Sequence, residues 1–268
     1  MNLNKNSRIY IAGHNGMVGS AVYNLLKKKK YNNIITASRK TLDLLNQKKT
    51  ENFLKRTRPN FVIIAAAKVG GILINQQNKA NFIYQNLTIQ NNLIHSSYKA
   101  GVKKLIFLGS SCIYPKFSKQ PLKENYLLSG MLEETNDAYA IAKISGIKMC
   151  EAYNQQYGLN YISLMPTNLY GPNDNYNSDT SHFFPALLSK IYYAKKNKLK
   201  EIVIWGNGKP KRELMYVEDL ADACEFFLKK KTRHNLINIG SGIEKTISEY
   251  TKFIMKKIGV KLKIRYDL

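Results

Sequence analysis

Short apolar runs alternate with longer amphipathic segments along most of this chain. The apolar runs are rich in β-branched residues and are predicted to be strands over 8–12, 33–37, 61–66, 104–108, 161–165, 201–205 and 236–239. Between the first two runs, apolar side chains recur at helical spacing from Met17 to Leu26. This alternation predicts an α/β fold of the Rossmann type, with a doubly wound parallel sheet covered by helices on both faces.

Polar, turn-forming residues fill the segment 171–181, which is predicted to leave the sheet as a loop. We therefore expect a nucleotide-binding domain over 1–170, with a later return of the chain at about 207–240. A smaller, mainly substrate-binding lobe is expected over 171–268. Residues 262–266 are predicted to form a further strand with nothing after Leu268 to pack beside it, so the C-terminus is expected to be incomplete.

The composition is strongly basic, with 42 Lys and Arg against 18 Asp and Glu and a formal charge of +24. Such a charge suits nucleic acid or an anionic membrane surface. The basic residues are scattered, however, and the chain is also rich in Asn, Ile and Tyr, so a compositional bias accounts for the charge equally well. We expect no specific nucleic-acid partner and favour an anionic small substrate.

The three cysteines, Cys112, Cys150 and Cys224, are widely spaced and form no CxxC or Cys/His grouping. This pattern predicts neither a disulfide framework nor a metal site and is consistent with a reducing cytoplasm. Residues 1–6 contain no apolar signal segment, and no stretch approaches eighteen uninterrupted apolar residues. We expect a cytoplasmic protein with no membrane partner.

A glycine-rich turn joins the first predicted strand to the first helix and reads Gly13, His14, Asn15, Gly16, Met17, Val18 and Gly19. Glycines let the backbone approach a pyrophosphate closely, and the helix N-terminus offers free N–H groups and a positive dipole end. Without its neighbours this pattern would equally fit an ordinary strand-to-helix turn. With a strand before it and a helix after it, the turn predicts dinucleotide binding.

The second predicted strand ends in Arg39 and Lys40, where an enzyme specific for NAD usually carries an acidic residue. A guanidinium can bind the 2′-phosphate of NADP through two hydrogen bonds, so Arg39 is the stronger candidate and Lys40 a supporting charge. The alternative is a basic surface loop. We expect NADP(H) as the cofactor.

Three residues form a candidate reductase site. Ser110 follows the strand 104–108, and Tyr139 and Lys143 lie four residues apart, hence on one face of a helix. Ser110 can donate a hydrogen bond to a substrate carbonyl while Tyr139 gives it a proton, and the Lys143 ammonium is expected to lower the phenol's pKa. The alternative is an exposed aromatic/lysine pair.

Six segments carry a resemblance that covers essentially the whole chain: 13–19, 65–71, 82–86, 108–116, 139–143 and 165–172. The sequences of these segments resemble those of the GDP-L-fucose synthase family, which belongs to the extended short-chain dehydrogenase/reductase superfamily. The resemblance implies NADPH-dependent conversion of GDP-4-keto-6-deoxy-D-mannose to GDP-L-fucose, by epimerisation at C3 and C5 and then reduction at C4. It also implies a homodimer joined through a helix bundle that includes the Tyr139 helix.

The resemblance also implies site residues. Cys112 and His182 would serve as base and acid for epimerisation, with pKa values tuned toward neutral pH, and Ser110, Tyr139 and Lys143 would serve reduction. Taken alone, Cys112 would more often be a small buried residue and His182 a loop histidine. Further implied cofactor contacts are Leu108, Gly109, Ser110, Ser111, Pro166, Thr167, Asn168, Leu169 and His182.

Implied substrate contacts lie later in the chain, at Trp205 for the guanine and at Arg212 and Lys190 for the diphosphate. Lys190 stands where the family often has Arg, so a point charge would replace a forked contact. Two alternatives remain open. One is another nucleotide-sugar epimerase or dehydratase of this fold, and the other is a non-catalytic protein that senses NADP or binds nucleic acid.

Overall fold

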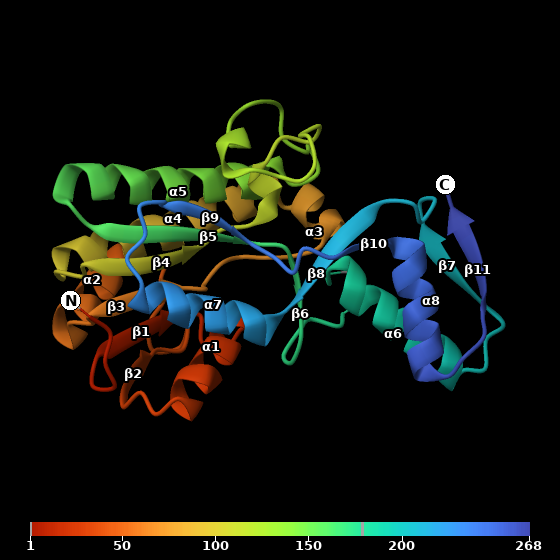
Figure 1. The fold of residues 1–268 in the computed structure, drawn as a ribbon, viewed down its shortest axis with the longest axis horizontal. Coiled ribbons are helices and arrows are strands. Elements are labelled where there is room, and N and C mark those ends of the chain that lie inside the picture. The colour runs from red at the N-terminus through yellow and green to blue at the C-terminus, as the bar shows by residue number, and fades with distance from the viewer. Residues whose placement is uncertain (1, 178–179) are drawn as a thin grey trace.

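The structure, a computed structural model, describes residues 2–177 and 180–268. Its larger part is built on a six-stranded sheet in the order β2-β1-β3-β4-β5-β9, in which every neighbouring pair is parallel (Figure 1). The strands are β1 (Arg8–Ala12), β2 (Asn33–Thr36), β3 (Phe61–Ile64), β4 (Lys104–Leu108), β5 (Asn160–Pro166) and β9 (Leu236–Ile239). The predicted Rossmann-type parallel sheet is confirmed.

Helices cover both faces of this sheet. Helices α1 (Met17–Lys28) and α7 (Val217–Lys229) pack on one face, and α2 (Gln47–Thr57), α4 (Lys79–Lys99) and α5 (Asp137–Tyr157) pack on the other (Figure 1). Side chains alternate between the faces, so Ile63 enters the first core and Val62 the second. Burial on both faces explains why the strands read as unbroken apolar runs.

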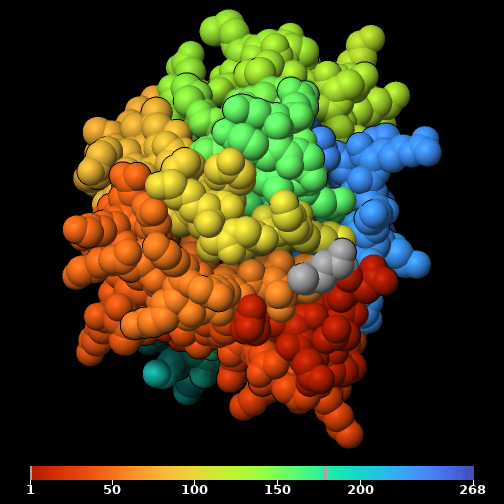
Figure 2. Space-filling view, turned by 90° about the vertical axis from the view of Figure 1, so that its left-hand side faces the viewer, coloured from red at the N-terminus to blue at the C-terminus, as the bar shows by residue number. Residues whose placement is uncertain are grey.

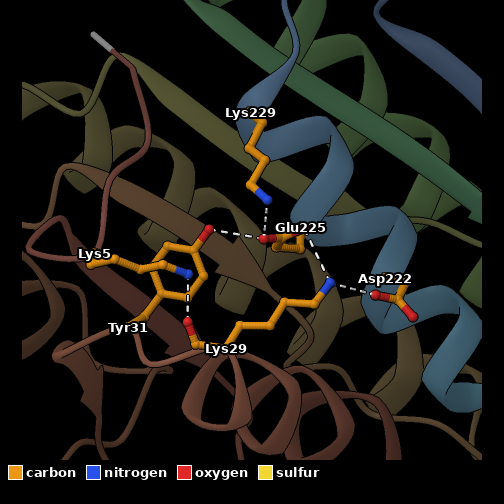
Figure 3. Close-up of polar contacts among 6 residues, drawn as sticks. All are labelled: Lys5, Lys29, Tyr31, Asp222, Glu225 and Lys229. Atoms are coloured by element: carbon orange, nitrogen blue, oxygen red, sulfur yellow. Dashed lines mark hydrogen bonds and ion pairs between the residues drawn. The ribbon is translucent and has the colours of Figure 1, made fainter.

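A polar cluster ties α7 to the N-terminal elements (Figure 3). The carboxylate of Glu225, only 5% exposed, accepts a hydrogen bond from the Tyr31 hydroxyl at 2.9 Å and pairs with Lys29 at 3.4 Å. Lys29 also pairs with Asp222 at 2.7 Å. Burial opposes ionisation of Glu225, but hydrogen bonds from Lys229 and Tyr31 outweigh it and lower its pKa. The late return of the chain is thereby fixed beside the first helix.

The smaller part has its own core. Strands β7 (Glu201–Trp205) and β11 (Lys263–Asp267) pair in parallel, and α6 (Phe183–Lys196) and α8 (Ile247–Ile258) pack against them (Figure 1). The strand predicted at 201–205 therefore belongs to this separate sheet and not to the central one. The strand predicted at 262–266 finds its partner earlier in the chain, in β7.

A three-stranded sheet joins the two parts. Its order is β10-β8-β6, with β6 (Asn168–Tyr170) parallel and β10 (Glu244–Thr246) antiparallel to β8 (Lys211–Tyr216). Sequence reasoning missed these strands because β6 and β10 have only three residues each, β10 is entirely polar, and β8 mixes polar with apolar residues. The predicted loop 171–181 is free of helix and strand where the structure describes it, and residues 178–179 lie outside the described residues.

The carboxyl ends of the central strands face the smaller part (Figure 1). Segments that follow β1, β3, β4 and β5 are therefore gathered at the boundary between the two parts. Figure 2 shows the opposite end of the molecule, where the smaller part is almost hidden. Within the described ranges, none of the helices has the length and apolar character needed to cross a membrane.

Candidate active site

The strand order places a topological switch point beside β1. The chain passes from β1 to β2 on one side and then to β3 on the other, so α1 and α4 leave the sheet on opposite faces. Ligands bind at such switch points in open α/β sheets. Gly13 lies here with φ +89°, and a Cβ atom on it would stand 2.7 Å from the Ala66 nitrogen. Only glycine permits this backbone contact.

The glycine turn fits a pyrophosphate group. A Cβ atom on Gly19 would lie 2.1 Å from the Gly13 carbonyl oxygen, so α1 packs directly on the turn. Gly16 is the N-cap of α1, and no side chain caps that end of the helix. The N–H groups of the first helical turn, including Met17 and Val18, are thus left for an anion. His14 is half-buried in the same turn, and Asn15 is exposed.

Two cations lie beside this turn. Arg39 and Lys40 are exposed in the turn after β2, which is closed by hydrogen bonds from Thr41 and Leu42 to the Ser38 carbonyl at 3.0 and 2.8 Å. Because β2 neighbours β1, their carboxyl ends share one edge. In the part of the chain that the structure describes, neither cation has an ion-pair partner. Both remain available to a phosphate.

A buried asparagine holds the backbone on the other side of this switch point. Asn86 on α4, 2% exposed, accepts a hydrogen bond from the Lys68 amide at 2.8 Å and donates to the Lys68 carbonyl at 3.0 Å. This pair of bonds fixes the segment that follows β3. Sequence reasoning did not assign Asn86 a role, although a polar residue on the apolar face of a helix was the available signal.

Ser110 begins a tight turn at the end of β4. The preceding Gly109 donates its N–H to Leu164 at 2.9 Å and has the Met165 side chain directly over its Cα. Residues Ser111–Ile113 form a short 3-10 helix, η1, and the Ser110 hydroxyl accepts a long hydrogen bond from the Cys112 amide at 3.5 Å. The turn therefore brings the Ser110 hydroxyl and the Cys112 segment together.

Lys143 projects from α5 toward the same strand end. It is 4% exposed, and its Nζ donates to the Leu108 carbonyl at 2.7 Å and lies 5.7 Å from the centroid of the Tyr139 ring. Burial lowers the pKa of Lys143 to about 8. Gly146 lets α5 approach closely, because a Cβ there would lie 2.5 Å from the Phe107 ring.

Tyr139 departs from one sequence expectation. Burial raises the pKa of its phenol, and the neighbouring Cys112 raises it further. Lys143 does not lower the phenol pKa as expected, and its ammonium donates a hydrogen bond to the Leu108 carbonyl instead. The phenol is consequently protonated at neutral pH, which is the form a proton donor requires.

Cys112 and His182 show opposite departures from their usual pKa values. Burial raises the pKa of the Cys112 thiol to about 11, although Ser110 and Lys143 oppose this effect. Tuning of the thiol toward neutral pH is therefore not found. The His182 residue is exposed. Desolvation by the surrounding protein nevertheless lowers the pKa of its imidazole, and the charge of Asp174 partly opposes this shift.

His182 lies directly before α6, in a segment held against the end of β3. Gly71 donates its N–H to the Thr180 carbonyl at 2.9 Å, and a Cβ on Gly71 would stand 2.5 Å from the Ser181 carbonyl oxygen. Among the described residues, no hydrogen bond joins His182 to Ser110, Tyr139 or Lys143. The structure thus groups Ser110, Cys112, Tyr139 and Lys143, whereas His182 lies at the start of α6, in the segment that contacts Gly71.

Residues 166–169 continue β5 past the site. Thr167 donates its N–H to Ile239 at 3.1 Å, and Asn168 donates its amide to the Glu213 carbonyl at 3.2 Å. The hydroxyl of Thr167 is buried with no partner in the described part of the chain. Pro166 is buried and Leu169 half-buried.

The three candidate substrate residues lie apart from this group. Trp205 ends β7 with 64% of its surface exposed, and Lys190 on α6 lies 5.7 Å from the Trp205 ring centroid while donating to Val203 at 2.7 Å. Desolvation lowers the pKa of Lys190. Arg212 is exposed on β8. Trp205 and Lys190 form one contact pair. In the described ranges, no hydrogen bond or cation–π contact joins Arg212 to either of them.

Comparison with known proteins gives the chain its relatives. Residues 9–240 match the model of the NAD dependent epimerase/dehydratase family. The chain is 50% identical over 263 residues to GDP-L-fucose synthase 1 of Arabidopsis thaliana, covering 98% of the chain and 81% of the relative. It is 45% identical over 269 residues to GDP-L-fucose synthase of Escherichia coli (strain K12), covering 97% and 84%.

A solved structure agrees with these relatives. The NADP-bound GDP-L-fucose synthetase of Naegleria fowleri superimposes with a TM-score of 0.91 at 29% identity, covering 100% of this chain and 82% of that one. The family model spans most of the chain, and the sequence relatives are matched over more than two thirds of their own length. The chain therefore belongs to the NAD dependent epimerase/dehydratase family and, within it, to the GDP-L-fucose synthase family.

Proposed function

We propose that this chain converts GDP-4-keto-6-deoxy-D-mannose to GDP-L-fucose, using NADPH, by epimerisation at C3 and C5 followed by reduction of the C4 ketone. The observation that carries the proposal is the grouping of Ser110, Cys112, Tyr139 and Lys143 at the end of β4, beside an uncapped helix end and a glycine turn that fit a dinucleotide. An NADP-bound family member of the same fold supports the choice of cofactor.

For reduction, the Tyr139 phenol gives its proton to the C4 oxygen, and the Ser110 hydroxyl donates a hydrogen bond to the same oxygen. The raised pKa of Tyr139 keeps this proton in place until the oxygen becomes basic. The chemistry that NADPH supplies when bound is the hydride delivered to C4. Lys143 holds a positive charge beside the reacting oxygen and is available to the nicotinamide ribose.

For epimerisation, a base removes the proton from C3 or C5 and an acid returns one to the opposite face. The C4 ketone acidifies both positions, since the charge spreads onto its oxygen, where Ser110 and Tyr139 can donate. Cys112 and His182 take the base and acid roles. The charge of Lys143 and the hydrogen bond with Ser110 offset part of the effect of burial, but the pKa of the thiol stays raised, at about 11. Forming the thiolate that this stage needs therefore costs free energy before the proton is removed from the sugar.

The test is a mixture of the purified protein with NADPH and GDP-4-keto-6-deoxymannose. The absorbance of the reduced nicotinamide should fall in step with formation of GDP-L-fucose. Unchanged absorbance over a long incubation would refute the proposal. Turnover with a retained cofactor that returns to its oxidised form, and no net loss of NADPH, would instead identify an epimerase or dehydratase. Salt-dependent DNA binding without turnover would identify a nucleic-acid-binding protein.

The role of Cys112 has a separate test in deuterated water. Cys112→Ser should lose deuterium incorporation at C3 and C5 while retaining some reduction at C4. Cys224→Ser is the matched control, because it makes the same chemical change in the core beneath α7, and it should keep full exchange in the folded fraction. Unaltered exchange in Cys112→Ser would remove Cys112 from the mechanism.

Cofactor and substrate assignments complete the site. We assign Gly13–Gly19, Arg39 and Lys40, 108–111, Lys143, 166–169 and His182 to NADP(H), and Trp205, Lys190 and Arg212 to the guanine and diphosphate. The cation–π contact of Lys190 with Trp205 supports a shared nucleotide pocket. Accordingly, 1–170 with the return at about 207–240 forms the cofactor domain, and 171–268 is mainly the substrate lobe.

We also propose a homodimer built on α4 and α5. These adjacent helices expose Tyr84, Ile141 and Tyr157 to 64%, 44% and 38%, and apolar surface of this kind favours association. Sedimentation should give twice the mass of the chain, and Ile141→Lys should shift it toward the monomer. A monomeric wild type would refute the dimer.

A cytoplasmic location is the remaining proposal. Three free cysteines without disulfides support a reducing compartment. Cell fractionation of the native host should recover the protein with soluble cytoplasmic enzymes, and recovery with exported proteins would contradict this.

A further inference from the structure

A tyrosine fastens the far end of the turn that carries Ser110 and Cys112. Tyr114 follows η1 directly, is only 5% exposed, and donates its hydroxyl to Oδ1 of Asn238 at 2.5 Å. Asn238 lies on β9, the edge strand of the central sheet, 124 residues further along the chain. The end of the Cys112 turn is thus attached to a strand remote in sequence.

The other polar groups of Asn238 are occupied by a second segment. Its backbone N–H donates to Oε1 of Glu124 at 2.8 Å, and its Nδ2 donates to the Leu122 carbonyl at 3.1 Å. Glu124 begins the short 3-10 helix η2 (Glu124–Tyr126). Because the Leu122 carbonyl can only accept, the amide of Asn238 has one orientation, and its Oδ1 must face Tyr114 as an acceptor.

The Cys112 turn depends on this attachment because its own hydrogen bonds are long. Ile113 donates to the Ser110 carbonyl at 3.3 Å, Tyr114 to the Ser111 carbonyl at 3.3 Å, and Cys112 to the Ser110 hydroxyl at 3.5 Å. These lengths exceed the usual range for N–H donors to oxygen. A turn with weak internal bonds keeps its shape through its two ends.

Tyr139 and Lys143, two of the groups assigned to reduction, are held independently of Tyr114, and Ser110 is also fixed from the β4 side of the turn. Gly109, next to Ser110, bonds to Leu164 on β5, and Lys143 bonds to the Leu108 carbonyl. Tyr139 shares helix α5 with Lys143, and the Gln90 side chain of α4 donates to the Ala142 carbonyl of the same helix at 2.6 Å. None of these contacts passes through Tyr114.

We propose that Tyr114, Asn238 and Glu124 form a positioning cluster that holds the Cys112 thiol for epimerisation and that reduction at C4 depends on it far less. The inference rests on the proposed function and assigns positioning residues to its first stage. Burial raises the pKa of Tyr114 to about 12, so its hydroxyl remains a donor throughout the pH range of the assay.

The test compares Tyr114→Phe with Tyr161→Phe. Both changes remove one buried hydroxyl from the same sheet region, since Tyr161 on β5 donates to the Val102 carbonyl at 3.0 Å, remote from the cluster. Tyr114→Phe should slow deuterium exchange at C3 and C5 by about tenfold, equivalent to one lost hydrogen bond. The share of product reduced at C4 without epimerisation should rise, and the Kd for NADPH should stay within about twofold. Tyr161→Phe should change none of these.

Two variants of the half-buried Glu124 provide a second test if Tyr114→Phe does not fold. Glu124→Gln keeps an acceptor for the Asn238 N–H and should retain normal exchange, whereas Glu124→Ala should slow it. Equal slowing of exchange and reduction, or wild-type exchange in both Tyr114→Phe and Glu124→Ala, overturns the inference. Absence of exchange and of NADPH oxidation in the wild type refutes the proposed function itself, and the inference falls with it.

Discussion

Replacement of Gly19 by alanine tests the glycine turn most directly. The added methyl group would stand 2.1 Å from the Gly13 carbonyl oxygen, 2.6 Å from the Gly13 carbonyl carbon and 2.8 Å from Cα of His14. All three are backbone atoms, so no side chain can rotate away. Restoring ordinary contact requires helix α1 and the turn to separate by about 1 Å.

Two effects follow from this separation, one on stability and one on cofactor binding. Overpacking of this kind costs about 1–3 kcal/mol, so the Tm of the cofactor-free protein should fall by several degrees. The N–H groups of α1 would also lose alignment with a bound phosphate, and charge-assisted hydrogen bonds contribute about 1.5–3 kcal/mol each. The Kd for NADPH should therefore rise at least about tenfold.

Gly16→Ala is the matched comparison in the same turn. Its methyl group would lie 3.5 Å from the Gly13 carbonyl oxygen, which is an ordinary contact, so the cofactor-free Tm should stay close to that of wild type. Any loss of NADPH affinity in Gly16→Ala would then report space that the cofactor itself occupies. Thermal melting with and without NADPH, together with a fluorescence titration, measures both quantities. A Gly19→Ala protein with wild-type Tm and Kd would refute this account of the turn.

Three further predictions concern the catalytic and cofactor groups. Tyr139→Phe should lower kcat for C4 reduction by about a hundredfold or more without weakening NADPH binding, and steady-state rates near wild type would contradict the proton-donor role. Lys143→Met removes a buried cation whose pKa is lowered from 10.5 in the unfolded chain to about 8 in the folded protein. Burying this charge destabilises the folded state fully below pH 8, and the destabilisation is relieved as the pH rises toward 10.5. The variant should therefore gain Tm relative to wild type at pH 7 and lose that advantage by pH 10, and a pH-independent difference would show that desolvation of Lys143 is not the cause. Arg39→Ala should raise the KM for NADPH by about tenfold and leave the KM for NADH unaltered, whereas equal changes for both would remove Arg39 from the 2′-phosphate site.

The central sheet could be predicted from the sequence because strands buried on both faces consist of continuous apolar residues, as in Phe61–Ile64. The strands of the three-stranded sheet were not predicted, because Asn168–Tyr170 and Glu244–Thr246 have only three residues each and pair with a strand far along the chain. Periodicity does not identify the partner of a strand, so it could not show that the strand ending at Trp205 pairs with Lys263–Asp267 in a separate sheet.

The candidate site divides in the same way. Ser110 at a strand end and Tyr139 and Lys143 on one helical face could be brought together from local rules alone. The directions of the Tyr139 and Cys112 pKa shifts could not, because desolvation depends on what the whole fold packs around each group. The bond from Tyr114 to Asn238 likewise joins residues 124 positions apart and leaves no local signal.

The three-stranded sheet β10-β8-β6 restricts how the two parts of the molecule can move. The chain crosses the boundary several times, and β8 pairs with strands on both of its sides. Rotation about one flexible linker would shear this ladder, so domain closure of the large, clamshell type is disfavoured. Substrate should therefore meet a crevice of nearly fixed width, and changes in sugar specificity are more accessible through individual side chains than through altered hinges.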